Sequence, residues 1–545
     1  ITELYPAPQE ATSIILTLKH NQLPLHRMDY VAIIKTGENR FEKVVIEVQK
    51  SPFIPEIERF RNYLAEKYSK TSTYKVNNEQ KEEHLPIKTI YLLDKKLSDN
   101  LPAVLHRKGD YYDVLYQKKY KGEKTTTKKP QQTKNQDIVY PQYNKKGIIN
   151  IPNTILQTFN ANNKKTSSPL ETQVDPKNIN KVVLLVVDGF GYHQFLKHNK
   201  QNRFLINLTT EGKVFPLTSV FPSQTTNALT TLSTGLTPQE HGLFEYFIYM
   251  KNAGVINALK FERAHSKEKN KTLEVDPGNL FRGKTIANTL KKTGIDCFTH
   301  MNMTNAGNAC SKLIFEGSTI IPSLKPSDLI VNLRKNIEKN SGNAYFFVHL
   351  DSLDTISHEY GPQSHEYQAE LSTITYLIQK ELIEKVNSET AKETLILITS
   401  DHGAVDVNPE ETTYIKLDSK NTLNLEVENT KKPVSPIGSP RDVFLHVKKE
   451  KLNWTKEILT QKIGEKAEII EIKEADRKGL FGLKESSQGF LERTGNLLII
   501  PKEKQTVWFE TQSKRRISFL GQHGGLNSEE MLVPFAIAKL IDLKR

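Results

Sequence analysis

The sequence predicts an α/β protein of two domains, and three observations support this. The length of 545 residues corresponds to two to four domains at about 150 residues each. Short, fully apolar runs alternate with helical segments after residue 148, which is typical of strands buried on both faces of a mainly parallel sheet. A lysine-rich stretch separates this part from a smaller amino-terminal one, and its segment TTTKKPQQT has no aliphatic side chain to bury.

The smaller part has a compact α/β pattern. Strands are expected over 30–35 and 43–49 around a turn at Gly37-Glu38-Asn39, followed by a helix over 55–67 and a strand over 87–93. We therefore assign residues 1–116 to a small domain, 117–147 to a linker and 148–545 to a large domain.

Positive charge is concentrated in the linker. Lys and Arg number 76 against 63 Asp and Glu, which leaves +13, and nine lysines against two acidic residues in 117–146 supply +7 of that excess. An excess of Lys and Arg over Asp and Glu favours a phosphate-bearing or polyanionic partner. Because more than half of the excess lies in the linker, we expect nucleic acid to be at most an auxiliary partner.

Composition excludes several classes of protein. No apolar run approaches the roughly 20 residues that span a bilayer, so we expect no membrane partner. Cys297 and Cys310 are too few for a disulfide framework and are expected to be free thiols in a reducing compartment. No signal peptide is visible, so we expect a cytoplasmic protein; the first residue is Ile, which leaves a removed leader or a trimmed terminus open.

Residue types that bind metal follow three predicted strands of the large domain, at 182–187, 345–348 and 395–398, and recur in a later GQHGG. They are Asp188, Asp354, His358, Asp401, His402 and His523. Carboxyl ends of parallel strands meet at one edge of a sheet, and a spacing of four residues puts Asp354 and His358 on one helical face. Oxygen and imidazole ligands without cysteine favour Zn²⁺ or Mn²⁺ over Ca²⁺.

A threonine begins the next predicted helix. Thr225 lies in FPSQTTN, which is followed by ALTTLSTG and then by Glu240-His241-Gly242. The free backbone N–H groups of a helix start favour a phosphate or an oxyanion beside this hydroxyl. An ordinary N-cap residue would occupy the same position.

This order of elements resembles the alkaline phosphatase superfamily, most closely its nucleotide pyrophosphatase/phosphodiesterase branch, over residues 181–534. The resemblance implies a central, mainly parallel sheet flanked by helices, two divalent ions, and hydrolysis of phosphoesters through a phospho-Thr225 intermediate. By position, it implies that Asp188, Asp401 and His402 hold the ion that also binds Thr225, and that Asp354, His358 and His523 hold the other.

Tyr246 departs from that family. It stands where the phosphodiesterase branch has an Asn that contacts a phosphate oxygen, and we take it as a substrate-binding residue. The departure leaves a phosphomonoesterase or phosphonate hydrolase open, whereas FPSQTT lacks the C/S-x-P-x-R arrangement of sulfatases. The remaining histidines are expected to be structural or exposed, among them His193, His241, His300, His349 and His365.

The predicted hairpin of the small domain carries acidic residues. Because side chains alternate along a strand, Glu47 and Gln49 share a face, and Asp29 lies on the neighbouring strand. With the segments EIERFRNYLAEKY and LPIKTIYLL, this part resembles a bacterial branch of the PD-(D/E)XK nuclease superfamily over 28–114. The resemblance implies that Asp29 and Glu47 bind Mg²⁺ and that Gln49 fills the position of a catalytic Lys. Since Gln neither accepts a proton nor carries charge, an inactive nucleic-acid-binding module is the alternative.

The sequence as a whole predicts a two-metal phosphoester hydrolase for nucleotides or nucleic acid, fused to a nuclease-like domain. No feature of it indicates an oligomeric state.

Overall fold

The structure is a computed structural model. It describes residues 138–161, 170, 172, 177–264, 278, 280–416, 425–426, 433–510 and 516–544, together with the backbones of strands within 19–116. The chain separates into two compact units, Ile1–Gln131 and Gln132–Arg545, and this division falls inside the predicted linker.

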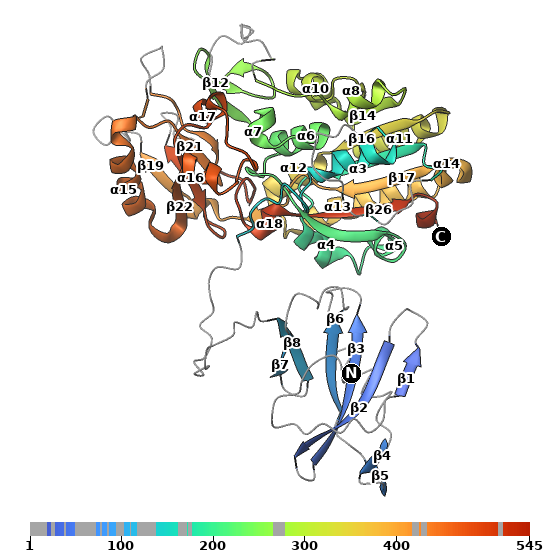
Figure 1. The fold of residues 1–545 in the computed structure, drawn as a ribbon. Coiled ribbons are helices and arrows are strands. Elements are labelled where there is room, and N and C mark those ends of the chain that lie inside the picture. Colours follow the sequence, from blue (N-terminus) through green and yellow to red (C-terminus); the bar gives the residue numbers. More distant parts are fainter. Residues whose placement is uncertain are drawn as a thin grey trace. The chain divides into compact units, whose positions relative to one another are not determined.

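The amino-terminal unit contains a sheet of six strands in the order β1-β2-β3-β6-β8-β7 (Figure 1). The expected hairpin is present as β2 and β3, whose antiparallel register places Asp29 opposite Glu47, and β6 lies parallel to β3. The predicted helix and the side chains of Asp29, Glu47 and Gln49 lie outside the described residues, so the Mg²⁺ site stays a prediction. The strands are β1 Lys19–Gln22, β2 Met28–Gly37, β3 Arg40–Gln49, β6 Ile87–Leu93, β7 Ala103–Lys108 and β8 Tyr111–Tyr116, with a separate hairpin of β4 Ser72–Val76 and β5 Glu79–Glu83.

The large unit is built on a seven-stranded sheet in the order β10-β26-β17-β9-β16-β14-β15. Five neighbouring strands, from β17 to β15, are parallel, as the apolar runs predict. The sheet is nevertheless mixed, because β26 pairs antiparallel with both β17 and β10. The bounds are β9 Lys181–Val187, β10 Lys213–Thr218, β14 Asp296–Asn302, β15 Thr319–Ser323, β16 Ala344–Leu350, β17 Thr394–Thr399 and β26 Leu532–Lys539.

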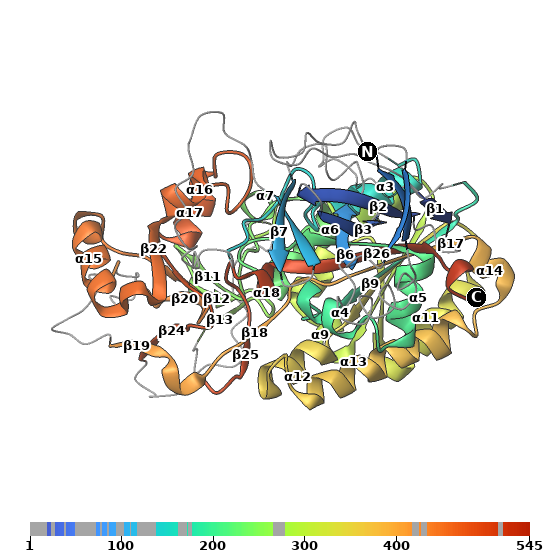
Figure 2. The same cartoon turned by 90° about the horizontal axis from the view of Figure 1, so that it is seen from below.

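Helices cover both faces of this sheet (Figures 1 and 2). Side chains of β9 alternate between two apolar clusters: Val182 and Leu184 pack in one, Val183 and Leu185 in the other. The first cluster includes side chains of α3 Asn150–Thr158, α6 Thr225–Thr234 and α8 Ile286–Lys291; the second includes those of α4 Tyr192–His198, α5 Arg203–Glu211, α11 Pro326–Lys339 and α13 His365–Leu377. A strand with apolar side chains on both sides requires this covering, because parallel sheets are buried on both faces.

A second, smaller sheet is formed by residues between β17 and β26 of the first. Its order is β20-β21-β23-β22, and α15 Leu452–Ile463 packs on it around Leu445, Leu459 and Ile499. The strands are β20 Ile437–Ser439, β21 Asp442–Leu445, β22 Ala467–Glu471 and β23 Leu497–Pro501. Figure 1 shows this sheet beside one end of the large sheet.

The last part of the predicted linker belongs to the large unit. Val139 N–H donates to Leu526 O at 2.8 Å, and the buried Tyr143 hydroxyl donates to Leu480 O at 2.6 Å. Burial of the Tyr143 side chain attaches this end of the stretch to the large unit.

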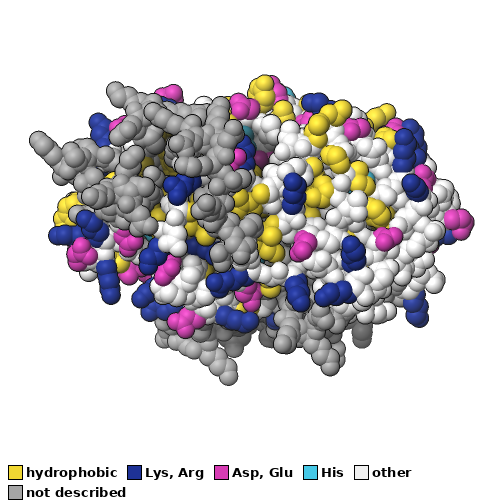
Figure 3. All heavy atoms as spheres, turned by 90° about the horizontal axis from the view of Figure 1, so that it is seen from above, with side chains coloured by type: hydrophobic (Ala, Val, Ile, Leu, Met, Phe, Trp, Pro, Cys, Tyr) yellow, Lys and Arg dark blue, Asp and Glu magenta, His cyan; other side chains and the backbone are white. Residues whose placement is uncertain are grey.

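The surface of the large unit mixes charges of both signs. On the face shown in Figure 3, Lys and Arg side chains are interspersed with Asp and Glu among the described residues. Within that same part of the chain, no helix combines the length and apolar character that crossing a bilayer requires. Cys297 and Cys310 are buried free thiols, in agreement with the sequence.

Candidate active site

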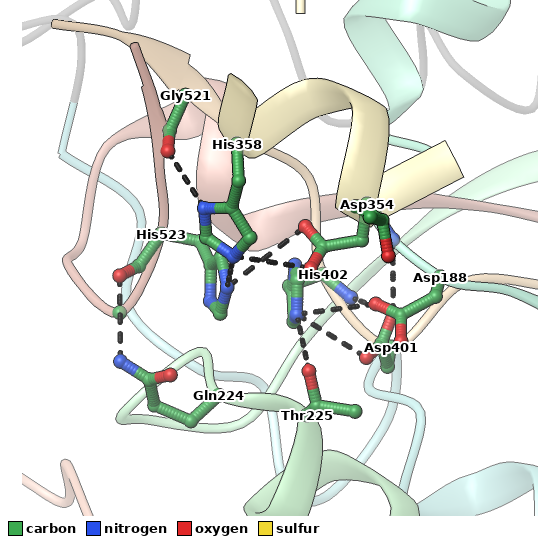
Figure 4. A network of polar contacts seen from close by, with 12 residues as sticks. Asp188, Gln224, Thr225, Asp354, His358, Asp401, His402, Gly521 and His523 are labelled. Atoms are coloured by element: carbon green, nitrogen blue, oxygen red, sulfur yellow. Dashed lines mark hydrogen bonds and ion pairs between the residues drawn. The ribbon is translucent and has the colours of Figure 1, made fainter. Parts of the chain in front are cut away.

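Seven of the predicted residues lie together at the carboxyl ends of three neighbouring strands (Figure 4). Asp188 directly follows β9, Asp401 and His402 follow β17, and α12 Ser352–Tyr360, which carries Asp354 and His358, follows β16. His523 comes next after β25 Gly521–Gln522, and Thr225 is the first residue of α6. Gly189 permits this convergence: its φ is +73°, and a Cβ there would lie 3.0 Å from the Asp354 side chain.

The three histidines are fixed in the same tautomer. In each, Nδ1 faces a backbone carbonyl: Gly521 O at 2.8 Å for His358, Gly403 O at 3.0 Å for His402 and Ser223 O at 2.9 Å for His523. A carbonyl only accepts, so each Nδ1 must donate, and each Nε2 has a lone pair when the imidazole is neutral. Metal-binding histidines are commonly oriented by a second hydrogen bond of this kind.

Asp188, Asp354 and Asp401 each have one carboxylate oxygen that forms no hydrogen bond. Asp401 Oδ1 accepts from the N–H groups of Gly189 at 3.2 Å and His402 at 3.0 Å, and Asp188 Oδ2 accepts from His349 Nε2 at 2.9 Å. The second oxygens of these two carboxylates, Asp401 Oδ2 and Asp188 Oδ1, are buried without a hydrogen bond, as is Asp354 Oδ1. Buried acceptors are rarely left unpaired in a protein. These three oxygens therefore fit a cation as their partner.

Distances between the facing atoms have the scale of a metal site. His402 Nε2 lies 3.2 Å from Asp401 Oδ2 and 3.5 Å from Asp188 Oδ1. His358 Nε2 lies 3.1 Å from Asp354 Oδ2 and 3.3 Å from His523 Nε2, and His523 Nε2 lies 3.9 Å from Asp354 Oδ1. Two ligands of a tetrahedral zinc ion, each about 2.0–2.1 Å from it, are about 3.3 Å apart. His402 also groups with Asp354 and His523, all ligand atoms lying within 4.8 Å, so it stands between the two predicted sites.

The side-chain charges of the site do not balance one another. Burial, together with Asp401 and Asp354, raises the pKa of Asp188 well above its usual range. Burial also acts to raise the pKa of Asp354, but His358 and His523 outweigh it and hold that pKa well below its usual value. A divalent cation beside Asp188 and Asp401 would neutralise the repulsion between them.

Thr225 faces the first of these groups. Its Oγ1 lies 3.1 Å from His402 Nε2, and its position at the start of α6 leaves backbone N–H groups of the first turn free of helical partners. The Thr225 hydroxyl therefore lies beside a candidate metal ligand and at a helix start, where free N–H groups favour an anionic group.

Tyr246 is half-buried. Its N–H donates to Glu245 Oε2 at 2.6 Å, and its ring packs edge-on against Phe247 with the ring centroids 4.7 Å apart. These described contacts do not include Thr225 or a carboxylate of the metal groups, so its substrate role stays a prediction.

The sequence did not reveal the residues that hydrogen-bond to the site residues and orient them. His349, which was expected to be structural, donates to Asp188 Oδ2, and Gln224 is hydrogen-bonded to Asp442 and to His523 O. His349 stands in a strand two residues before the Asp-rich segment, which is a weak signal. The sequence carries no such signal for Asp442, because this residue lies in the second sheet.

Two comparisons bear on the family. The model of the family "Type I phosphodiesterase / nucleotide pyrophosphatase" matches residues 182–526, which contain Asp188, Thr225 and His523. No curated protein gives a significant match.

The chain is also similar to solved structures. Murine ectonucleotide pyrophosphatase/phosphodiesterase 5 is 17% identical, with a TM-score of 0.49, and the match covers 65% of this chain and 87% of that one. The human protein of the same name is 18% identical, with a TM-score of 0.47 and the same coverage. An inactive form of the murine protein in complex with AMP is 16% identical, with a TM-score of 0.48, covering 66% of this chain and 87% of that one.

Proposed function

Because the family model spans more than half of its length, the chain belongs to the type I phosphodiesterase/nucleotide pyrophosphatase family, and we propose that it hydrolyses phosphodiester or pyrophosphate bonds of nucleotides through Thr225. One observation carries this proposal: Thr225 Oγ1 lies 3.1 Å from His402 Nε2, at the edge of the buried Asp and His cluster. Clusters of Asp and His that hold two metal ions are well suited to in-line displacement at phosphorus, because the ions stabilise both the attacking and the leaving oxygen.

The family is typically dinuclear, and the residues present fit two divalent ions. We assign Asp188, Asp401 and His402 to one ion, with Thr225. We assign Asp354 and His523 to the other, together with His358, whose Nε2 faces both. The ligand types fit Zn²⁺ or Mn²⁺. When bound, such ions lower the pKa of a hydroxyl and neutralise charge on the phosphate oxygens.

The protein's own groups do the rest of the chemistry. Thr225 Oγ attacks phosphorus, the leaving oxygen departs on the opposite side, and water then hydrolyses the phospho-threonine. The free N–H groups at the start of α6 favour negative charge on the phosphoryl group. His349 keeps Asp188 in place by its hydrogen bond to Oδ2.

A second candidate function uses the same site. Tyr246 stands in place of the expected Asn, so the amide contact on which the diester preference was based is absent, and the alternative is a phosphomonoesterase or phosphonate hydrolase. The proposal also includes the nuclease-like identity of the amino-terminal unit. Support for it comes from the β2–β3 pairing, in which Asp29 and Glu47 are register partners.

Thr225→Ala tests the main proposal. We expect kcat/KM on bis-p-nitrophenyl phosphate to fall by about a thousandfold or more, because a nucleophile is lost, while bound metal measured by elemental analysis persists. Thr234→Ala is the matched control, since its hydroxyl lies at the other end of α6 and bonds to Thr230 O at 2.7 Å.

Undiminished turnover by Thr225→Ala would sink the proposal. The same assay on mono-p-nitrophenyl phosphate separates the two candidates: a wild-type preference for the monoester, also lost in Thr225→Ala, selects the second.

A further inference from the structure

The turn between β20 and β21 reaches from the second sheet into the candidate active site. The strands pair antiparallel, and the residues at their turn, Ser439 to Asp442, contact the segment that carries His523. Ser439 Oγ donates to His523 O at 3.3 Å, for example. A segment remote from the metal groups in sequence is thus built into their surroundings.

Arg441 anchors this turn. Its guanidinium donates from Nε to Glu530 Oε1 at 3.0 Å and from Nη2 to Glu530 Oε2 at 2.7 Å, and both side chains are fully buried. Glu530 Oε1 in turn accepts from Gly525 N–H at 3.0 Å. A buried two-pronged pair fixes geometry, and loss of one partner leaves an unpaired charge.

Asp442 contacts the site through Gln224. Asp442 Oδ1 accepts from Gln224 Nε2 at 3.1 Å and from the Ser439 hydroxyl. The same Gln224 Nε2 lies 3.3 Å from His523 O, a contact drawn in Figure 4. Gly524 makes room for this arrangement, because a Cβ there would lie 2.4 Å from both Asp442 Oδ1 and Gln224 Nε2.

Glu245 lies beside Asp442, and both side chains are fully buried. Glu245 Oε2 accepts from Tyr246 N–H at 2.6 Å. Glu245 Oε1 and Asp442 Oδ2 have no hydrogen-bond partner among the described residues. Burial and Glu245 raise the pKa of Asp442 well above its usual range, while Asp442 Oδ1 accepts from Gln224 Nε2.

We propose that Asp442 is a positioning residue which, through Gln224, holds the backbone on both sides of the site, at Thr225 and at His523. Gln224 is the N-cap residue of α6 and directly precedes Thr225, so holding its side chain also fixes the start of that helix. The inference rests on the proposed function, in which Thr225 attacks and His523 binds an ion.

Substitutions in the full chain test this role. Asp442→Ala is expected to lower kcat on bis-p-nitrophenyl phosphate and to weaken Mn²⁺ binding by the metal-stripped chain, each by about 10- to 100-fold, with KM little changed. Gln224→Met should have the same effect, because it removes the donor while leaving Asp442 in place. Asp442→Asn should restore most of both, since its Oδ1 still accepts from Gln224 and its Nδ2 donates to Glu245.

Asp476→Ala is the matched control. Asp476 accepts from Ser486 N–H at 3.0 Å and from the Ser486 hydroxyl at 2.5 Å in the same part of the chain, without contact to Gln224 or His523 among its described bonds. Its kcat and Mn²⁺ affinity should match the unmodified chain.

Two results would overturn the inference: Gln224→Met or Asp442→Ala behaving like Asp476→Ala in both measurements, or Asp442→Asn being as impaired as Asp442→Ala. Failure of the proposed function is a separate result, because it would appear as turnover by Thr225→Ala. The Mn²⁺ measurement is readable in either case.

Discussion

His241 shows how a single buried side chain makes stability depend on pH. Its Nδ1 lies 3.1 Å from Leu243 N, so it must accept, and its Nε2 then donates to Thr231 Oγ1 at 3.1 Å. The Thr231 hydroxyl in turn donates a hydrogen bond to Leu236 O at 3.0 Å. Every group is paired only while the imidazole is neutral, and burial lowers the pKa of His241 to about 3.

Acidification should therefore destabilise the protein through His241. The pKa of an unfolded His is about 6.5, so the unfolded chain binds a proton that the folded chain excludes, and stability falls as pH drops below that value. At pH 5 the loss is about 2 kcal/mol. Urea unfolding at pH 8 and pH 5 measures it.

His241→Gln should reduce that pH dependence by about 2 kcal/mol, because Gln offers an acceptor and a donor but does not titrate. His365→Gln, at an exposed position, should leave it unchanged. An identical pH dependence in His241→Gln and the unmodified chain would contradict the assignment.

At the scale of elements, strand ends were predictable and the second sheet was not. The apolar run before Asp188 and the four-residue spacing of Asp354 and His358 are local patterns, and the structure has a strand and a helix there. The antiparallel β26 was not foreseen, because buried parallel and antiparallel strands share the same apolar composition. Asp442 depends on a contact between distant segments, for which a single sequence carries no periodic signal.

The loop after β17 tolerates no added atom at Gly403. A Cβ there would lie 2.0 Å from Glu529 O and 2.8 Å from Gly191 Cα, so Gly403→Ala must displace backbone next to His402. We expect a loss of about 1–3 kcal/mol in the free energy of unfolding. Gly307→Ala is the control, because nothing lies within 4 Å of its Cβ position. Equal stability of the two variants in thermal unfolding would contradict this packing.

At the scale of the whole molecule, charge and catalytic chemistry are separated along the chain. Residues 117–146 supply +7 of the net +13, whereas the candidate site consists of Asp, His and Thr side chains. The described surface in Figure 3 mixes both signs. Electrostatic attraction to a polyanion is therefore a property expected of the lysine-rich stretch and not of the hydrolase site.

Binding of single-stranded DNA by the full chain should depend on salt through that stretch. Replacing Lys118, Lys119, Lys121 and Lys124 with Gln should reduce the slope of log K against log salt by about 0.7 for each lysine that contacts phosphate. Replacing the exposed Lys291, Lys292, Lys312 and Lys339 of the large unit instead should change it little. Equal slopes for the two variants, measured by fluorescence anisotropy, would exclude tethering by this stretch.

The position of β26 has a consequence for synthesis of the protein. Within the described sheet, β10 pairs with β26 alone, and Lys213 is opposite Ile537. Translation of the roughly 300 residues between them takes on the order of 15–60 s at about 5–20 residues per second. During that interval a nascent chain carries β10 without its partner strand, and the described segment before it contributes a bridge between Gly147 and Thr218. Until β26 is made, one edge of β10 is open to pairing with another chain, and until residue 523 is made the candidate metal site lacks His523.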